Sequence, residues 1–144
     1  MEKMVTNNFK ETADLGFRIG QTCLGGEIFA LYGNLGAGKT TFLQGLAQGL
    51  GVKMQVNSPT FNILKLYKTK PKSIVKEFCH IDAYRLSSEK DLIALGVNEF
   101  LKAKDTVTAI EWVEKVESIL PKKIIRIYIE NTSESSRKIK IKRG

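Results

Sequence analysis

Residues 33–40 read Gly33-Asn34-Leu35-Gly36-Ala37-Gly38-Lys39-Thr40, a complete G-x-x-x-x-G-K-[ST] phosphate-binding loop. In such a loop, backbone N–H groups wrap the phosphates of a nucleoside triphosphate, the lysine reaches the outer phosphates and the hydroxyl binds Mg²⁺. The glycines allow the backbone to approach the phosphates closely. With Gly at about 7% of residues, roughly one chain of this length in two hundred would match by chance. The loop therefore predicts a nucleotide-binding protein.

The segments on either side of the loop fit the strand–loop–helix context that the motif requires. Glu27–Tyr32 is a short apolar run after Gly25-Gly26, which predicts a buried strand. Thr41–Leu50 has apolar residues at helical spacing and is followed by Gly51, which favours a helix end. The N-terminus of this helix would add its partial positive charge to the anion site. A glycine-rich turn without a ligand is the weaker interpretation.

Length and composition favour one globular domain, residues 1–144. The chain has 144 residues, of which 42% are hydrophobic and 26% charged, and a chain of this size can bury a core of its own. Cys23 and Cys79 lack metal-type spacing and are interpreted as reduced packing residues. The N-terminus has no apolar leader segment, and no run approaches 18 apolar residues. We therefore expect a cytoplasmic protein that does not bind a membrane.

The net charge of +8 is concentrated in Lys68–Lys72 and in Arg137–Arg143. Lysines alternate with isoleucines in Lys138-Ile139-Lys140-Ile141-Lys142. The favoured interpretation is a solvated lysine face on an edge strand, which blocks edge-to-edge aggregation. The alternative is an electrostatic footprint for RNA or an acidic partner. No aromatic residues interleave with these lysines, so the pattern does not predict a base-stacking platform.

Outside the loop, periodicity predicts alternating strands and helices. The resulting fold class is a single-domain α/β, P-loop NTPase-like fold with a mixed central sheet flanked by helices. Helices are expected over Glu11–Cys23, over Ser88–Leu95, with Ser88 and Asp91 as a capping pair, and between Ile110 and Leu120. Further strands are expected over Phe61–Tyr67 and Ile74–Ile81 (a hairpin), Val107–Ile110, and a last hairpin through Ile125–Ile129 and Ile139–Ile141.

Two acids directly follow apolar strands. Asp82 follows Ile74–Ile81, and Glu111 follows Val107–Ile110. Ligands of α/β folds bind at the carboxyl ends of sheet strands, and Mg²⁺ prefers hard oxygen ligands. One acid would therefore hold the metal beside Thr40, directly or through water, and the other would orient the attacking water. Each acid could instead be a surface carboxylate at a strand end.

Three other features leave alternatives open. Ser58-Pro59-Thr60 lies where a segment that senses the γ-phosphate would lie, or it is a plain turn. His80 is interpreted as a packed strand histidine in preference to a catalytic one. Arg85 would either serve phosphate charge or fix the loop after Asp82.

Four segments occur together in this order: LYGNLGAGKTTF (31–42), SPT (58–60), HIDAYRL (80–86) and IEW (110–112). Their combination resembles the bacterial TsaE (YjeE) family, the ATPase required for the tRNA modification threonylcarbamoyladenosine. The resemblance runs from about Phe9 to Ile141. It implies that Gly36–Thr41 bind the ATP phosphates, that Thr40 and Glu111 bind Mg²⁺, and that Asp82 is the Walker B acid.

The same resemblance implies a segment near the base around Phe9–Thr12, where Phe9 would stack on adenine, and a recurring basic position at Arg137. One departure is Asn34, where the family usually has an acid. The candidate nucleotide-binding residues are Phe9, Thr12, Gly33, Asn34, Leu35, Gly36, Ala37, Gly38, Lys39, Thr40, Thr41 and Arg137. The candidate metal ligands are Thr40, Asp82 and Glu111, and the candidate catalytic residues are Lys39, Asp82 and Glu111.

By this resemblance, the chain would hydrolyse ATP beside a TsaB–TsaD complex, and that complex would transfer the threonylcarbamoyl group to tRNA. tRNA would be contacted directly or through the complex. A nucleotide-gated assembly module with negligible hydrolysis stays open, because both acids could serve metal binding alone. A small-molecule kinase is disfavoured because only Arg85 lies near a motif, and a GTPase because no N-K-x-D string occurs.

Overall fold

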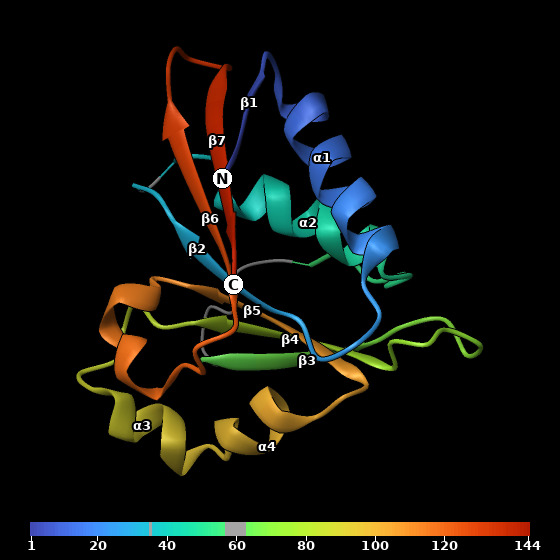
Figure 1. The fold of residues 1–144 in the computed structure, drawn as a ribbon, viewed down its shortest axis with the longest axis vertical. Coiled ribbons are helices and arrows are strands. Elements are labelled where there is room, and N and C mark those ends of the chain that lie inside the picture. The colour runs from blue at the N-terminus through green and yellow to red at the C-terminus, as the bar shows by residue number, and fades with distance from the viewer. Residues whose placement is uncertain (35, 57–62) are drawn as a thin grey trace.

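A seven-stranded mixed sheet flanked by helices forms the centre of the computed structural model, which describes residues 1–34, 36–56 and 63–144 (Figure 1). Leu35 and the Ser58–Thr60 segment lie outside these ranges. The elements are β1 (Glu2–Thr6), α1 (Phe9–Thr22), β2 (Ile28–Tyr32), α2 (Lys39–Gly49), β3 (Leu64–Lys68), β4 (Glu77–Asp82), α3 (Glu89–Ala94), α4 (Val97–Lys102), β5 (Thr106–Glu111), the 3₁₀ helices η1 (Val113–Lys115) and η2 (Glu117–Ile119), β6 (Ile125–Asn131) and β7 (Arg137–Arg143).

The strands lie in the order β1-β7-β6-β2-β5-β4-β3. The four central strands β6, β2, β5 and β4 are parallel to one another. The outer pairs β6–β7, β1–β7 and β3–β4 are antiparallel. The expected mixed sheet and both expected hairpins are confirmed.

Helices cover the central strands on both faces. α1 and α2 lie together on one face, and α3 and α4 lie on the other (Figure 1). Phe42 and Leu46 of α2 belong to the core on the first face, whereas Leu92 and Val97 belong to the core on the second. Strands that are buried on both faces need near-continuous apolar sequence, which explains the uniform apolar run that precedes the phosphate-binding loop.

The contact between α1 and α2 depends on glycines. A Cβ atom at Gly45 would lie 1.9 Å from the carbonyl oxygen of Ala13, and one at Gly16 would lie 2.3 Å from that of Phe42. Because no side chain fits there, the two helix backbones approach each other directly. This contact places the N-terminus of α2, and with it the phosphate-binding loop, on the sheet.

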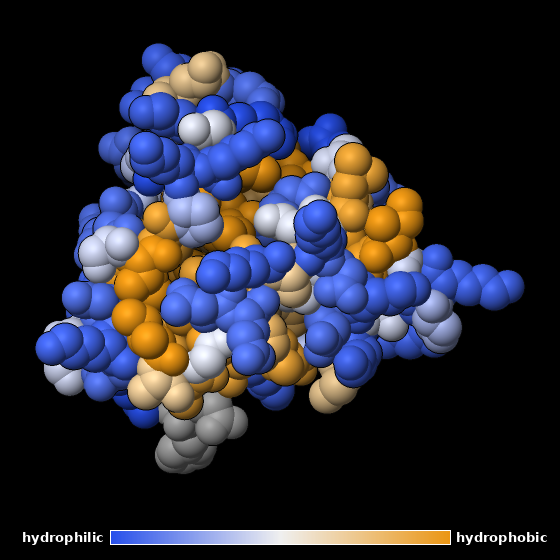
Figure 2. Space-filling model, turned by 60° about the horizontal axis from the view of Figure 1, so that its bottom comes forward, coloured by the Kyte–Doolittle hydropathy of each residue, from blue (hydrophilic) through white to orange (hydrophobic). Residues whose placement is uncertain are grey.

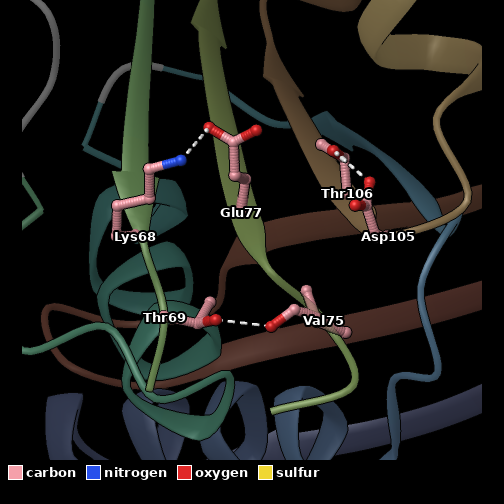
Figure 3. A network of polar contacts seen from close by, with 6 residues as sticks. All are labelled: Lys68, Thr69, Val75, Glu77, Asp105 and Thr106. Atoms are coloured by element: carbon pink, nitrogen blue, oxygen red, sulfur yellow. Dashed lines mark hydrogen bonds and ion pairs between the residues drawn. The ribbon is translucent and has the colours of Figure 1, made fainter. Parts of the chain in front are cut away.

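Polar contacts join β3 and β4 at the loop end of their hairpin (Figure 3). Lys68 and Glu77, which are cross-strand neighbours, form an ion pair of 3.2 Å. The hydroxyl of Thr69 donates to the carbonyl oxygen of Val75. Such pairs stabilise an antiparallel register, and this register places the far end of β4, with Asp82, at the sheet edge that carries the phosphate-binding loop.

Three features of the fold differ from the sequence-based expectations. β1 and α4 were not expected, and the segment after β5 contains η1 and η2 in place of the expected helix up to Leu120. Val113, Val116 and Ile119 recur every third residue, and Val113 and Val116 are buried. That repeat matches the three residues per turn of a 3₁₀ helix.

The lysine-rich last strand is not an edge strand, so that expectation is wrong. β7 lies between β6 and β1, and the register pairs Lys140 with Lys3. The alternation itself is confirmed, because Ile139 and Ile141 are buried whereas Lys138 and Lys142 are exposed. The lysines therefore form one face of an internal strand and do not protect a sheet edge.

The expected cap of α3 is confirmed in part. The Ser88 hydroxyl accepts the N–H of Lys90 at 3.3 Å. The carboxylate of Asp91 accepts from Ser87. In a reciprocal capping box, the Asp91 carboxylate would accept from the N–H of Ser88 and not from Ser87.

Apolar residues (orange) form several patches between charged side chains on the side of the molecule that carries α3 and α4 (Figure 2). The exposed apolar side chains of this region include Ile93, Leu95 and Tyr84. Within the part of the chain that the structure describes, no helix is both long and apolar enough to cross a membrane.

Candidate nucleotide-binding site

The phosphate-binding loop joins the end of β2 to the start of α2. Gly36 and Gly38 have φ values of +80° and +98°, a region that residues with a Cβ rarely adopt. The N–H of Ala37 donates to the carbonyl oxygen of Asn34 at 3.0 Å. The loop therefore ends at a helix N-terminus, where backbone N–H groups and the helix dipole favour an anion.

Arg137 holds the back of this loop. Its Nε donates to the carbonyl oxygen of Ala37 at 2.8 Å, and Nη2 donates to that of Gly36 at 3.3 Å. Nη1 donates to the carbonyl oxygens of Ser133, Glu134 and Ser136. The side chain is buried, so in this structure it ties the last hairpin to the backbone of the loop.

The start of α1 lies beside the same arginine. The guanidinium carbon of Arg137 lies 5.4 Å from the ring centroid of Phe9, and Phe9 is 53% exposed. Thr12 is fully buried, and its hydroxyl bonds that of Thr6 at 2.7 Å. Phe9 is thus an accessible aromatic ring next to the loop, whereas Thr12 anchors α1 on β1, and a nucleotide contact of Thr12 stays a prediction.

Lys39, the first residue of α2, is buried. Its ammonium nitrogen lies 3.9 Å from the ring centroid of Trp112, within cation–π distance. Burial lowers the pKa of Lys39, while the negative charges of Glu111, Glu114 and Asp82 oppose that change. The acids at the two strand ends, Glu111 and Asp82, are therefore near enough to this lysine to raise its pKa.

Asp82 and Glu111 end two adjacent parallel strands and are direct register partners. Burial raises the pKa of Asp82; the N–H of Tyr84, which donates to its Oδ1 at 3.0 Å, opposes the rise, and nearby Glu111 adds to it. Both acids lie at the sheet edge where the phosphate-binding loop begins, as the strand-end argument predicted.

His80 holds Glu111 from the same face of the sheet. Its Nε2 lies 2.8 Å from Oε2 of Glu111, and both side chains are almost fully buried. The interpretation of His80 as a packed strand residue is confirmed, but the bond to Glu111 was not predicted. The strand register would have indicated this bond. His80 pairs with Ala109, and Glu111 lies two residues further along β5, so both side chains are on the same face of the sheet.

A second set of contacts joins the segments that follow the two acids. Trp112 adopts φ +57°, the one positive φ found for a non-glycine residue within the described ranges. Its ring lies 4.9 Å from that of Tyr84. The ammonium of Lys115 donates to the carbonyl oxygens of Tyr84 and Leu86. Such backbone strain is often found at functional sites, and none of these contacts was predicted.

The remaining candidate residues also lie around the loop. Thr40 is half-buried in the first turn of α2, Arg85 is exposed after β4, and both make contacts within the fold. Among the residues described, no group of three or more His, Cys, Asp or Glu side chains would hold a metal by itself. A Mg²⁺ ion, however, keeps several waters and shares phosphate oxygens, and the hard oxygens of Thr40, Asp82 and Glu111 fit that chemistry.

The mixed sheet, the loop at the start of α2 and the paired strand-end acids define a P-loop NTPase-like protein. A solved structure of Bacillus subtilis YdiB superposes with a TM-score of 0.73 at 30% identity, covering 96% of this chain and 82% of the other. The chain belongs to the TsaE family. The family model described as "Threonylcarbamoyl adenosine biosynthesis protein TsaE" matches residues 6–139.

Individual relatives bear the same description. The tRNA threonylcarbamoyladenosine biosynthesis protein TsaE of Treponema pallidum is 34% identical over 139 residues, which cover 96% of this chain and 98% of the relative. The TsaE protein of Bacillus subtilis is 39% identical over 114 residues, which cover 79% and 68%. The expected family is therefore confirmed, and the likeness extends over nearly the whole chain.

Proposed function

We propose that the chain is the ATP-binding and ATP-hydrolysing component of threonylcarbamoyladenosine biosynthesis in tRNA. The relatives are named for this biosynthesis. The observation that supports the ATPase activity is the convergence of three charged residues of separate elements. Lys39 is the first residue of α2, and Asp82 and Glu111 are the last residues of β4 and β5. The negative charges of both acids raise the pKa of Lys39. This is the arrangement that a Mg²⁺–triphosphate needs.

The phosphates bind at the start of α2. The backbone N–H groups of Gly36–Thr41 wrap them, and Lys39 contacts the outer phosphates. Arg137 supports this contact indirectly, because it fixes the loop carbonyls. Phe9, exposed beside Arg137, stacks on the adenine.

Thr40 and Glu111 would hold the metal ion, and His80 keeps the Glu111 carboxylate in place. Asp82, the more exposed acid, would act through the water shell that such an ion retains. When bound, Mg²⁺ neutralises charge that develops on the phosphates.

A role in tRNA modification places the protein in the cytoplasm, beside the complex that transfers the threonylcarbamoyl group. The proposed partner is the TsaB–TsaD complex. The chemistry of this chain is then ATP hydrolysis, and the group transfer to adenosine belongs to the partner.

The decisive experiment is a single-turnover measurement of phosphate release from γ-labelled ATP, with and without Mg²⁺ and TsaB–TsaD. We expect Mg²⁺-dependent release as inorganic phosphate that is lost in Lys39→Ala and Glu111→Gln and retained in Lys90→Ala, a matched change at an exposed lysine of α3. Binding without release, even with the partner, would replace the ATPase by a nucleotide-gated assembly module. Label on a small molecule would reveal a kinase.

A further inference from the structure

One face of the β1–β7–β6 part of the sheet carries a cluster of cations. α1 and α2 cover the opposite face, and within the described ranges no α-helix packs over this one (Figure 1). The 3₁₀ helix η2 borders it, where Glu117 contacts Tyr32. The side chains of this face come from alternate positions of the three strands. We name this surface the basic sheet face and define it by Lys3, Arg126, Tyr128, Lys138, Lys140 and Lys142. Glu130 of β6 lies on the same face, directly opposite Lys138.

Two register pairs on this face bring like charges directly opposite each other. Lys3 of β1 pairs with Lys140 of β7, and Arg126 of β6 pairs with Lys142. Like charges at directly opposed positions destabilise a sheet. A sequence that breaks a local stability rule without a gain in folding commonly does so at a functional site. Glu130 offsets Lys138, and Glu117 lies near Arg126. The excess of positive charge is therefore centred on Lys3, Lys140 and Lys142, where an anion would be stabilised.

Two stacked tyrosines lie next to these cations. Tyr128 pairs with Lys140 across β6 and β7, and its ring stacks on that of Tyr32 with centroids 4.7 Å apart and planes 13° apart. The hydroxyl of Tyr32 donates to Glu117, which fixes the orientation of the ring. A cavity of about 380 Å³ is lined by the two tyrosines, by Lys138 and Lys140, and by the acid Glu130.

We propose that the basic sheet face binds an unpaired strand of RNA. The lysines and Arg126 contact successive phosphates, and a base enters the cavity and stacks on the tyrosine pair. Aromatic rings beside cations are the usual elements of single-strand recognition, because stacking accepts any base while the cations follow the backbone. An acidic protein surface would use the cations but would have no need of the half-exposed tyrosine pair beside the cavity.

This RNA site is separate from the nucleotide site but adjacent to it. Gly33, the first residue of the phosphate-binding loop, lines the same cavity, and Tyr32 directly precedes it. The two sites thus share the end of β2. Nucleotide binding measured alone tests the ATPase proposal, so failure of the RNA site leaves that proposal unaffected.

The test is fluorescence anisotropy of the full chain with a labelled single-stranded RNA of about 12 nucleotides and with an unmodified tRNA transcript. Lys140→Glu removes a central cation, and Tyr128→Leu removes the stacking ring. The matched control is Lys53→Glu, which makes the same charge change at an exposed lysine after α2. Poly-glutamate serves as a competitor that has charge but no bases.

We expect Lys140→Glu to weaken RNA binding by about tenfold or more and to flatten the dependence of log K on log salt by about 0.7 for each phosphate that the variant no longer neutralises. Tyr128→Leu should weaken binding by about tenfold while leaving the salt slope unchanged. Lys53→Glu should stay within about twofold of wild type, as expected of a lysine that binds no phosphate. The Tm and nucleotide affinity of each variant show that it is folded.

Three results would overturn the proposal. The first is the absence of RNA binding by the wild-type chain. The second is an equal weakening in Lys140→Glu and Lys53→Glu, which would show attraction by net charge alone. The third is a combination of two observations: poly-glutamate competes as well as unlabelled RNA does, and Tyr128→Leu binds RNA as tightly as the wild type. That combination would assign the face to an acidic protein.

Discussion

The ammonium of Lys39 lies 3.9 Å above the ring of Trp112, at the point where the start of α2 meets the end of β5. The contact joins the lysine of the phosphate-binding loop to the residue directly after Glu111. A buried cation over an indole ring is stabilised by about 0.5–2 kcal/mol. The lysine, the ring and the acid therefore form one cluster, and a change in the surroundings of any of them should reach the other two.

The fluorescence of Trp112 should report nucleotide binding. Trp112 is the only tryptophan of the chain, and under the proposed function Lys39 would exchange its ring contact for phosphate oxygens when a triphosphate binds. We expect the emission to change on addition of Mg²⁺-ATP and the Mg²⁺ dependence to be reduced in Glu111→Ala. A wild-type signal that ignores saturating nucleotide would show that this strand end does not lie beside the phosphates.

The chain should bind ATP in preference to GTP, and binding should depend on Mg²⁺. The phosphate-binding loop is complete, but no guanine-reading segment occurs in the sequence. Lys39→Ala should weaken ATP binding by roughly ten- to a hundredfold, the range expected for hydrogen bonds to a charged group. Calorimetric titration of both nucleotides measures this, and equal affinities would contradict the base preference.

ATP hydrolysis by the isolated chain should be slow and should accelerate with TsaB–TsaD. A partner can stabilise transition-state charge in trans or close a segment over the γ-phosphate. Turnover is measured alone and with the complex, for wild type and for Arg85→Ala. Arg85 lies in the exposed segment after Asp82, so rapid hydrolysis by the isolated chain that collapses in Arg85→Ala would instead identify an arginine finger in cis.

Gly45→Ala should destabilise the fold although Ala normally favours a helix. The helical preference is worth about 0.5–1 kcal/mol, but the added Cβ would lie 1.9 Å from the carbonyl oxygen of Ala13. Moving the α1 backbone away should cost about 1–3 kcal/mol in the free energy of unfolding. Urea denaturation measures this, with exposed Gln48→Ala of the same helix as the control, expected within about 0.5 kcal/mol. Equal stabilities would show that α1 and α2 pack less tightly.

The thiols of Cys23 and Cys79 should react slowly in the native protein. Neither is in a disulfide, and burial raises the pKa of each to about 12. The thiolate fraction at pH 8 is then roughly one in ten thousand. Labelling with a thiol reagent should be slow in buffer and rapid in denaturant, and rapid native labelling of Cys79 would contradict its burial.

The same shift predicts how stability depends on pH. The folded chain binds these protons more tightly than the unfolded chain, whose thiols have a pKa near 8.5. The contribution of the two protonated thiols is therefore complete below about pH 8.5 and is lost as the pH rises towards 12. Urea denaturation between pH 8 and pH 10 measures the decrease in stability, which should shrink in Cys23→Ala.

Local sequence predicted those features that local physics dictates. The loop Gly33–Thr40 could be predicted from the sequence, because its glycines, lysine and hydroxyl are the residue types that a nucleoside triphosphate site requires. The apolar runs before Asp82 and Glu111 predicted two buried strands with an acid at the end of each. The structure shows that these strands are parallel neighbours, which brings both acids to one edge of the sheet. The prediction of an α-helix after Glu111 was wrong. Val113 and Val116 repeat every third residue, a spacing shorter than the period of an α-helix, and the repeat is too short to be recognised in the sequence.

Other features arise only when distant segments meet. β1 is a five-residue strand whose partner is β7, at the other end of the chain, and no local pattern shows that pairing. For the same reason the lysine strand was assigned to an edge. Arg137 reaches Ala37, a hundred residues away along the chain, and only the completed sheet brings them together.

The sequence by itself determined the family and predicted the chemistry of the candidate nucleotide site, because a phosphate-binding loop is one contiguous segment that carries all of its own residue types. Only the tertiary structure placed His80 on Glu111, Lys39 on Trp112 and the Tyr32–Tyr128 pair among the lysines of β7. Each of these contacts joins side chains of different elements. Their geometry depends on strand order and register, which are set by the burial of the whole sheet and not by any one segment.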